Sequence, residues 1–302
     1  MGRSGSSRVN SAGEQWVLGV IGGSGLYEIE GLAHREWRSI GSPWGEPSDD
    51  ILFGELDGVQ LRFLPRHGRG HKLSPSDLDF RANIDALKRA GCTDIVSLSA
   101  VGSLREELPP GAFVVVDQFV DRTFARPKSF FGRGLVAHVS MAEPVCPRLS
   151  RLVAEAAREA GAAIVVQGGT YLAMEGPQFS TKAESTLYRQ WGCDVIGMTN
   201  MPEAKLAREA ELPYASLAMV TDYDCWRDDG EAVQVEHILA VMHANAARAK
   251  DTVRRLAGKL VGPRARSPID TVLDAALITP PEHRDVGLVD KLDAVAGRVL
   301  RR

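Results

Sequence analysis

The sequence has little cysteine and no long apolar run. Its four cysteines are far apart in 302 residues, with neither a CxxC pair nor the spacing of a zinc site, so we expect buried reduced thiols and no metal. No apolar run approaches the roughly 20 residues of a membrane-spanning helix, and no charged start leads into an apolar signal core. We therefore expect a cytoplasmic protein without a membrane partner.

An excess of charge of one sign is lacking as well. The 36 Lys and Arg residues are interspersed with 39 Asp and Glu residues, giving a net charge of -3. Such a distribution offers no basic surface for nucleic acid. Hydrophobic residues make up 44% of the chain, which is enough to build a full core. These features predict a globular protein whose partner is a small molecule.

Familiar catalytic motifs are incomplete. The glycine-rich run at residues 22–27 follows an apolar strand, but Glu28 stands where GxGxxG needs its third glycine, and the lysine of a Walker A loop is missing. A Rossmann oxidoreductase is therefore poorly supported. Ser180 lacks the surrounding GxSxG elbow, so it is not expected to be a nucleophile. The glycines and Ser24 still make the run a candidate phosphate loop, because backbone N–H groups can approach an anion there.

Polar clusters occur where apolar runs stop, above all between Gly169 and Trp226. This stretch reads as strand, loop, helix, strand, helix, strand, and its clusters are MEGPQF at 174–179, MTNMPE at 198–203 and TDYD at 221–224. Sites in open α/β sheets lie at such strand ends. We expect the three strand ends to form the walls of one pocket.

Two further loops carry candidate binding groups. A hairpin at residues 51–64 ends in the basic turn 65–71, which has two Arg and two His residues among glycines and is suited to an oxyanion. The segment Asp94 to Leu98 reads as a strand that runs into a small-residue loop at 99–103. Between them, the apolar spacing predicts a helix over 76–90.

The remaining pattern predicts helices and the domain organisation. Residues 181–184 fit a capping box, with Ala183, Leu187 and Trp191 expected on the buried face of the helix that follows. A last helix is expected after Pro280-Pro281, with Leu288, Leu292, Val295 and Val299 on one face. We expect a flexible leader at 1–15, one domain at 16–258, and a linker with C-terminal helices at 259–302 that packs on the domain or a neighbour.

Taken together, six runs resemble the 5'-methylthioadenosine phosphorylase branch of the trimeric purine nucleoside phosphorylase family. The runs are GGSGLY at 22–27, PRHG at 65–68, GSLREE at 102–107, DQFVDRT at 117–123, MEGPQF at 174–179 and TDYDCW at 221–226. The match extends over about residues 16–257 in the same order. It implies a single α/β domain with a central mixed β-sheet flanked by helices, a homotrimer, and cleavage of a nucleoside by inorganic phosphate without cofactor or metal.

The resemblance also implies roles for individual residues. The phosphate shell is expected to contain Ser24, Arg66, His67, Ser99, Ala100 and Thr199. Phe179 and Met198 are expected over base and ribose, and Asp222 and Asp224 are expected to read the base. Ser180 and Val235 resemble positions that shape substrate preference, and His138 resembles a residue that reaches the 5' end of the nucleoside from a neighbouring subunit.

The chemistry of the Asp pair supports this assignment. Asp222 and Asp224 alternate along a segment expected to be extended, so their side chains can share one face. Two close carboxylates raise the pKa of one of them, which suits a general acid that protonates N7 of the leaving purine. We assign that role to Asp222. A carboxylate also accepts from a 6-amino group, which favours adenine over a 6-oxopurine.

Three alternatives remain open. A 5'-methylthioinosine phosphorylase and a general purine nucleoside phosphorylase both prefer 6-oxopurines, and Asp222 argues against each. A nucleoside-binding protein that has lost turnover would keep the same fold. The intact set of expected phosphate contacts argues against it.

Overall fold

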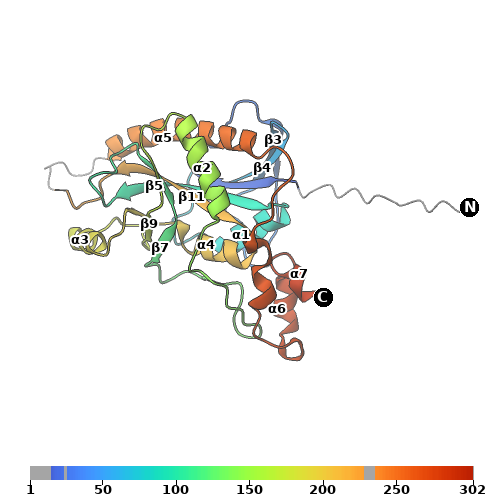
Figure 1. Cartoon of the computed structure of the whole chain (residues 1–302). Helices are drawn as coiled ribbons and strands as arrows, with labels where there is room; N and C mark the ends of the chain where they lie inside the picture. Colours follow the sequence, from blue (N-terminus) through green and yellow to red (C-terminus); the bar gives the residue numbers. More distant parts are fainter. Residues whose placement is uncertain (1–14, 24–25, 228–234, 302) are drawn as a thin grey trace, which may run out of the picture.

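A computed structural model describes residues 15–23, 26–227 and 235–301, with only the backbone at 235–240 (Figure 1). The expected leader lies outside these residues, apart from Gln15. In the described part, an eleven-stranded mixed sheet is flanked by helices on both faces. The predicted α/β class with a central mixed sheet is confirmed.

The sheet combines parallel and antiparallel neighbours. Its main strand order is β2-β3-β4-β1-β5-β10-β9-β7, while β11 pairs with β5 and β6, and β6 pairs with β8. The strands are β1 (Val17–Gly22), β2 (Ala33–Arg38), β3 (Ile51–Leu56), β4 (Val59–Pro65), β5 (Asp94–Ser103), β6 (Phe113–Val116), β7 (Gln118–Asp121), β8 (Val165–Gln167), β9 (Thr170–Ala173), β10 (Val195–Gly197) and β11 (Tyr214–Asp222). The predicted hairpin is β3 and β4, which pair antiparallel.

Strand β5 lies at the centre and changes neighbours along one edge. It runs parallel to β1 as far as the pair Ile21 and Ser97. Antiparallel β10 takes over that edge at the pair Ile196 and Gly102. In the described register, residues 98–101 therefore have a strand neighbour only on the other edge, where β11 continues alongside. The ends of β1 and β10 approach each other across this gap in the sheet.

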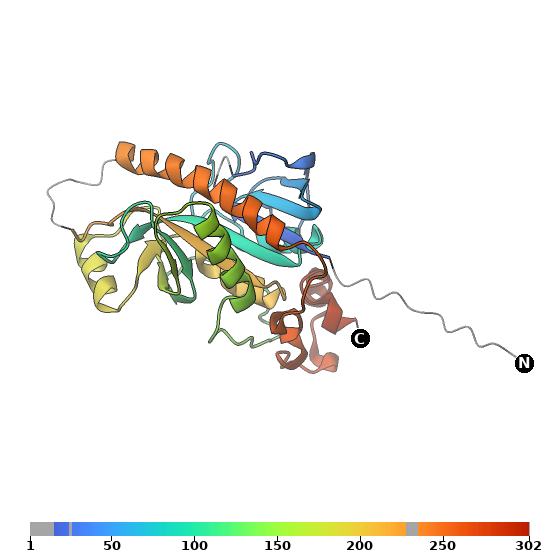
Figure 2. The same ribbon diagram turned by 45° about the horizontal axis from the view of Figure 1, so that its top comes forward.

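Helices cover both faces of the sheet, and each face has its own hydrophobic core. On one face lie α2 (Pro147–Glu159) and α5 (Val235–Lys259), and on the other α1 (Phe80–Arg89) and α4 (Asn200–Glu209) (Figure 1, Figure 2). Alternate residues of β5 serve the two cores, since Val96 packs with the α2 side and Ile95 with the α1 side. α3 (Lys182–Gln190) lies at the end of the molecule opposite the C-terminal segment (Figure 2).

The C-terminal segment packs on the α1 and α4 side. It contains η1 (Pro268–Ala275), η2 (Pro281–His283), α6 (Val286–Lys291) and α7 (Gly297–Leu300). Leu292 and Val295 are buried in the core there, as their spacing predicted. The expectation of one continuous last helix is wrong, because the helix ends at Lys291 and resumes only at Gly297.

Three local predictions also need correction. The helix expected from residue 76 begins at Phe80, because the Asp79 side chain caps it by accepting from the N–H of Ala82 at 3.2 Å. The loop expected at 99–103 is strand, since β11 continues to pair with β5 through it. The capping box of α3 is confirmed, but Ala183, Leu187 and Trp191 are all exposed. The buried residues of this helix are Ser185 and Tyr188.

Candidate active site

The gap in the sheet brings three strand ends to the open edge of β5. Ser99 and Ala100 lie on the open edge of β5, and Thr199 follows the end of β10. β1 leads into the glycine-rich run, although Ser24 itself lies outside the described residues. The turn after β4 carries Arg66, whose N–H donates to Gly22 O at 2.9 Å. Five of the six residues expected to bind phosphate are described, and the three strands β4, β5 and β10 position them around one edge.

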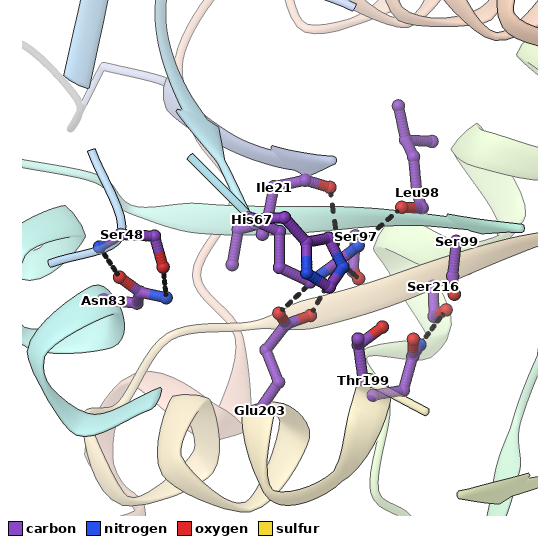
Figure 3. Close-up of polar contacts among 12 residues, drawn as sticks. Ile21, Ser48, His67, Asn83, Ser97, Leu98, Ser99, Thr199, Glu203 and Ser216 are labelled. Carbon is purple, nitrogen blue, oxygen red and sulfur yellow. Dashed lines mark hydrogen bonds and ion pairs between the residues drawn. The ribbon is translucent and has the colours of Figure 1, made fainter. Parts of the chain in front are cut away.

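Arg66 is buried, and its hydrogen-bond partners Glu203, Ser97 and Leu98 lie close together in Figure 3. Its Nε donates to Glu203 at 3.0 Å and its Nη2 to Ser97 Oγ at 2.6 Å. Its Nη1 donates to the carbonyl oxygen of Leu98 at 2.9 Å, on the open edge of β5. The guanidinium is therefore fixed at the gap by both β5 and α4.

Glu203 is a residue that the sequence reasoning missed. It lies in the first turn of α4, directly after MTNMP, and is buried. Besides Arg66, it accepts a hydrogen bond from the hydroxyl of Tyr214 at 2.8 Å. The signal was present in the sequence as a carboxylate inside one of the three polar clusters, but its partner lies 137 residues away.

His67 is held in one tautomer. Its Nδ1 lies 2.9 Å from the carbonyl oxygen of Leu73, and because a carbonyl only accepts, Nδ1 carries the proton. The ring stacks on His71 with centroids 4.4 Å apart. Burial, followed by the charge of Arg66, lowers the pKa of His67 to about 4. At neutral pH the ring is uncharged and its Nε2 can accept a hydrogen bond.

Tyr171 and Arg126 are two more residues that the sequence reasoning missed. The hydroxyl of Tyr171 is buried between Ser99 Oγ at 3.4 Å and the N–H of Thr199 at 3.5 Å. Arg126 donates to the carbonyl oxygens of Met198 and Glu175. It thereby joins the MEGPQF and MTNMPE turns, so these two strand ends lie together as predicted.

Asp222 and Asp224, the residues expected to read the base, lie over Gly102 of β5. A Cβ added at Gly102 would be 3.1 Å from Asp222 Oδ1 and 3.4 Å from the Cβ of Asp224. Asp222 accepts from Thr221 Oγ1 at 2.7 Å and from the N–H of Asp224 at 2.8 Å. The segment is a turn, since Asp224 has φ of +54°, so the expectation of an extended segment is wrong. The two carboxyls are nevertheless neighbours.

Burial raises the pKa of both carboxyls. For Asp222, burial outweighs the hydrogen bonds from Thr221 and the backbone. For Asp224, burial acts first and the nearby charge of Asp222 adds to it. Among the hydrogen bonds of the described residues, Asp224 Oδ2 has no partner. This end of the site can hold a proton that an exposed carboxyl would have lost.

The remaining candidates flank these two ends. Met198 lies against Gly176, where a Cβ would overlap its sulfur. Cys225 Sγ lies 3.2 Å from the carbonyl oxygen of Ser180, which joins the TDYD turn to MEGPQF. Phe179 is 72% exposed. Val235 begins α5, and its side chain lies outside the described ones.

His138 is exposed and lies beside the C-terminal segment. Its N–H donates to Ala276 O at 2.9 Å, and the neighbouring N–H of Ile278 donates to Val136 O at 2.9 Å. No hydrogen bond of the described residues joins the His138 side chain to Phe179 or Asp222. The residues described also contain no cluster of His, Cys, Asp and Glu that could hold a metal ion.

Comparisons with known proteins agree with this geometry. The sequence profile of the "Phosphorylase superfamily" matches residues 17–258. The S-methyl-5'-thioadenosine phosphorylase of Cereibacter sphaeroides is 61% identical over 94% of this chain and 99% of its own. That of Rhodospirillum rubrum is 59% identical over 97% and 100%.

Solved structures show the same likeness. A methylthioadenosine phosphorylase from an Antarctic soil metagenomic library superposes with a TM-score of 0.88 at 46% identity, covering 93% of this chain and 99% of its own. The methylthioadenosine phosphorylase of Schistosoma mansoni in complex with adenine has a TM-score of 0.78 at 35% identity, covering 86% and 98%.

Proposed function

The chain belongs to the phosphorylase superfamily, which it matches over residues 17–258, and we propose that it catalyses phosphorolysis of S-methyl-5'-thioadenosine. Inorganic phosphate attacks C1' and releases adenine and 5-methylthioribose 1-phosphate. The enzyme is a pentosyltransferase, and the products enter purine and methionine salvage. Two relatives with this activity in their names are 59% and 61% identical over nearly the whole chain.

One observation carries the proposal: the two ends of the site lie on the same strand. Ser99, at the phosphate end, lies on the open edge of β5 near Arg66. Gly102, at the base end, contacts Asp222 and is three residues further along the same strand. At about 3.3 Å per residue the two ends are about 10 Å apart. A phosphate at one end and a purine at the other leave room for a ribosyl group between them.

At the phosphate end, the residues hold the nucleophile in line with C1'. We assign this role to Arg66, His67, Ser99, Ala100 and Thr199, together with Ser24. Arg66 and the hydroxyl donors orient the anion and neutralise part of its charge. The uncharged His67 accepts a hydrogen bond from the P–OH of phosphate, since its Nδ1–H is already engaged with Leu73.

At the base end, Asp222 donates a proton to N7 as the C1'–N9 bond breaks. The electron pair of that bond passes to the purine, and the new bond forms between C1' and a phosphate oxygen. The proton that phosphate loses on becoming an ester restores the acid. Phe179 and Met198 cover base and ribose, and Asp224 accepts from the 6-amino group.

The first test is adenine release from S-methyl-5'-thioadenosine with and without inorganic phosphate, run beside 5'-methylthioinosine and inosine. We expect fast release that requires phosphate and is confined to the first nucleoside. Faster cleavage of the 6-oxopurine nucleosides would leave a phosphorylase but overturn the base-reading role of Asp222. Tight nucleoside binding without any cleavage would indicate a binding protein.

A homotrimer is the second part of the proposal. It is supported by two exposed apolar side chains near the site, Phe124 at 81% and Phe179 at 72%, which association would cover. In this arrangement His138 reaches the 5' group from a neighbouring subunit, and Ser180 and Val235 shape the same end. Light scattering coupled to gel filtration tests the trimer, and a monomer would contradict it.

The remaining assignments concern organisation and conditions. Residues 16–258 form the catalytic domain, and 259–302 pack on it, which the ion pair of Arg298 with Glu211 at 2.5 Å supports. Phosphate is the only co-substrate and no cofactor takes part, so activity should survive dialysis against a chelator. The enzyme works in the cytoplasm, in keeping with its free thiols. No helix of the described residues is long and apolar enough to cross a membrane.

A further inference from the structure

Because Arg66 pairs with Glu203, few of its N–H groups are available to a ligand. A guanidinium has five N–H groups. Nε and Nη2 of Arg66 donate to Glu203 at 3.0 and 3.3 Å, Nη2 also donates to Ser97 Oγ, and Nη1 donates to Leu98 O. Among the described residues, only one N–H, on Nη1, has no acceptor. Because Leu98 O lies on the open edge of β5, the Nη1 atom that carries this N–H lies at the gap.

Glu203 is itself held firmly. Its side chain and that of Arg66 are each 3% exposed. The Tyr214 hydroxyl donates to Glu203 Oε1 at 2.8 Å, so a residue of β11 also holds the carboxylate. Figure 3 shows Glu203 projecting from α4 toward the segment of β5 that carries Ser97, Leu98 and Ser99. Tyr214 therefore orients the carboxylate of Glu203 independently of Arg66.

We propose that Glu203, supported by Tyr214, is a positioning residue that aims the free Nη1–H of Arg66 at the phosphate. This inference rests on the proposed function, because it assumes that phosphate binds at the gap. Without the carboxylate, the guanidinium can rotate toward other acceptors, and the single N–H no longer meets the anion. A purely structural ion pair would instead stabilise the fold and leave phosphate use unchanged.

Glu211 provides a matched control. Its side chain is also 3% exposed, it follows directly after α4, and it pairs with an arginine, Arg298. It contacts the C-terminal segment and not the gap. The substitution E211Q therefore removes an equally buried carboxylate from the same helix region without touching the phosphate shell.

The experiment measures phosphate binding by calorimetry and initial rates with phosphate and nucleoside varied separately, on the full chain. For E203Q we expect the Kd and KM for phosphate to rise roughly tenfold or more, the range of a charge-assisted hydrogen bond. The KM for S-methyl-5'-thioadenosine should stay within about twofold. Y214F should shift phosphate use less, in the same direction, because the carboxylate remains.

The outcomes separate this inference from the proposed function. Unchanged phosphate binding in E203Q, or an equal loss in E211Q, would overturn the positioning role. If E203Q does not fold, Y214F decides by the same criterion. A wild-type protein that binds inorganic phosphate but does not cleave the nucleoside would refute the proposed function, and the calorimetric comparison of the variants would still test Glu203.

Discussion

The two ends of the site satisfy their charged groups in opposite ways. At the end to which we assign phosphate, the charge of Arg66 is matched by a buried carboxylate, and its hydrogen bonds are nearly saturated. At the end to which we assign the base, Asp222 and Asp224 are partly buried beside each other, and burial raises the pKa of both. The bonds that Asp222 accepts come from a hydroxyl and a backbone N–H.

The difference separates two tasks of one reaction. An anion that must be held in line needs donors that do not move, and a buried ion pair keeps them fixed before the ligand arrives. A leaving base that must be protonated needs an acid that keeps its proton near neutral pH. The predictions below test this contrast, starting with the largest expected effect.

Replacing Asp222 by Asn should remove the acid and keep the shape. We expect kcat for S-methyl-5'-thioadenosine to fall about 10²-fold to 10⁴-fold, the usual contribution of general acid catalysis. Because an amide both donates and accepts, relative preference should shift toward 6-oxopurines. Rates on the adenine and hypoxanthine nucleosides check this, and an unchanged preference would exclude Asp222 as the base reader.

The pH profile provides the control for that variant. The raised pKa of Asp222 keeps the acid protonated to a higher pH than an ordinary carboxyl. Wild-type activity should therefore decline as pH rises through this pKa, and the D222N variant should lose that limb. A variant with the same alkaline limb as the wild type would place the acid elsewhere.

Glu209 tests whether burial alone raises the pKa of a carboxyl outside the site. Burial raises its pKa to about 7 although Ser129 Oγ and the N–H of Phe130 donate to it. A carboxyl with a raised folded pKa stabilises below its unfolded pKa and loses that contribution as pH rises toward the folded value. Between about pH 4.5 and 7 the free energy of unfolding should fall by about 3 kcal/mol.

The substitution E209Q should flatten that dependence. Unfolding by urea at several pH values measures it, with activity followed in parallel. If wild type and E209Q lose stability equally over this range, another group is responsible. Activity at saturating substrate should stay close to the wild-type level, because Glu209 contacts the 129–130 segment and not the gap.

At the phosphate end, Arg66→Ala should act mainly on phosphate. Loss of its charged hydrogen bond should raise the KM for phosphate about tenfold to 100-fold. The variant also leaves Glu203 buried and unpaired, which costs about 3–5 kcal/mol of stability, so Tm is recorded beside the kinetics. An unaltered phosphate saturation curve would remove Arg66 from the phosphate shell.

The smallest effect is expected for His138→Ala, which touches neither end. The side chain should act on the 5' group, so the preference for S-methyl-5'-thioadenosine over adenosine should narrow by about tenfold or less. Relative kcat/KM values for the two nucleosides measure it. An equal loss on both would indicate damage to the 134–138 segment, which the C-terminal residues Ala276 and Ile278 hold by backbone hydrogen bonds.

Local sequence patterns predicted much of this fold. Apolar runs ending in turn residues located β1 and the β3–β4 hairpin, and the Thr181 capping box located the start of α3. The buried face of α3 was wrong because Leu187 and Trp191 follow helical spacing, yet the helix lies at one end of the molecule. Periodicity shows which residues share a face, but not whether another element covers it.

The site was predictable where one short segment carries the chemistry. Arg66, His67 and the Asp pair each stand in a compact polar cluster, and their resemblance to a known branch assigned roles. Glu203 and Tyr171 were missed because Arg66 lies 137 residues from Glu203 and Ser99 lies 72 residues from Tyr171 in the chain, and only the sheet brings each of these pairs together. Residues that far apart in the chain form no local sequence pattern from which their contact could be predicted. The extended strand through 99–103 was missed for the same reason, since β11 supplies its pairing.

The central position of β5 has a consequence for how fast the site can change. Over 95–97 the strand is paired on both edges, so these amides should exchange with deuterium only when the whole domain unfolds. Residues 98–101 have a strand on one edge only, and amides that point into the gap should exchange sooner. Strand β5 is therefore too stable for its local opening to control turnover. The entry and exit of ligands must depend on movements of the surrounding loops.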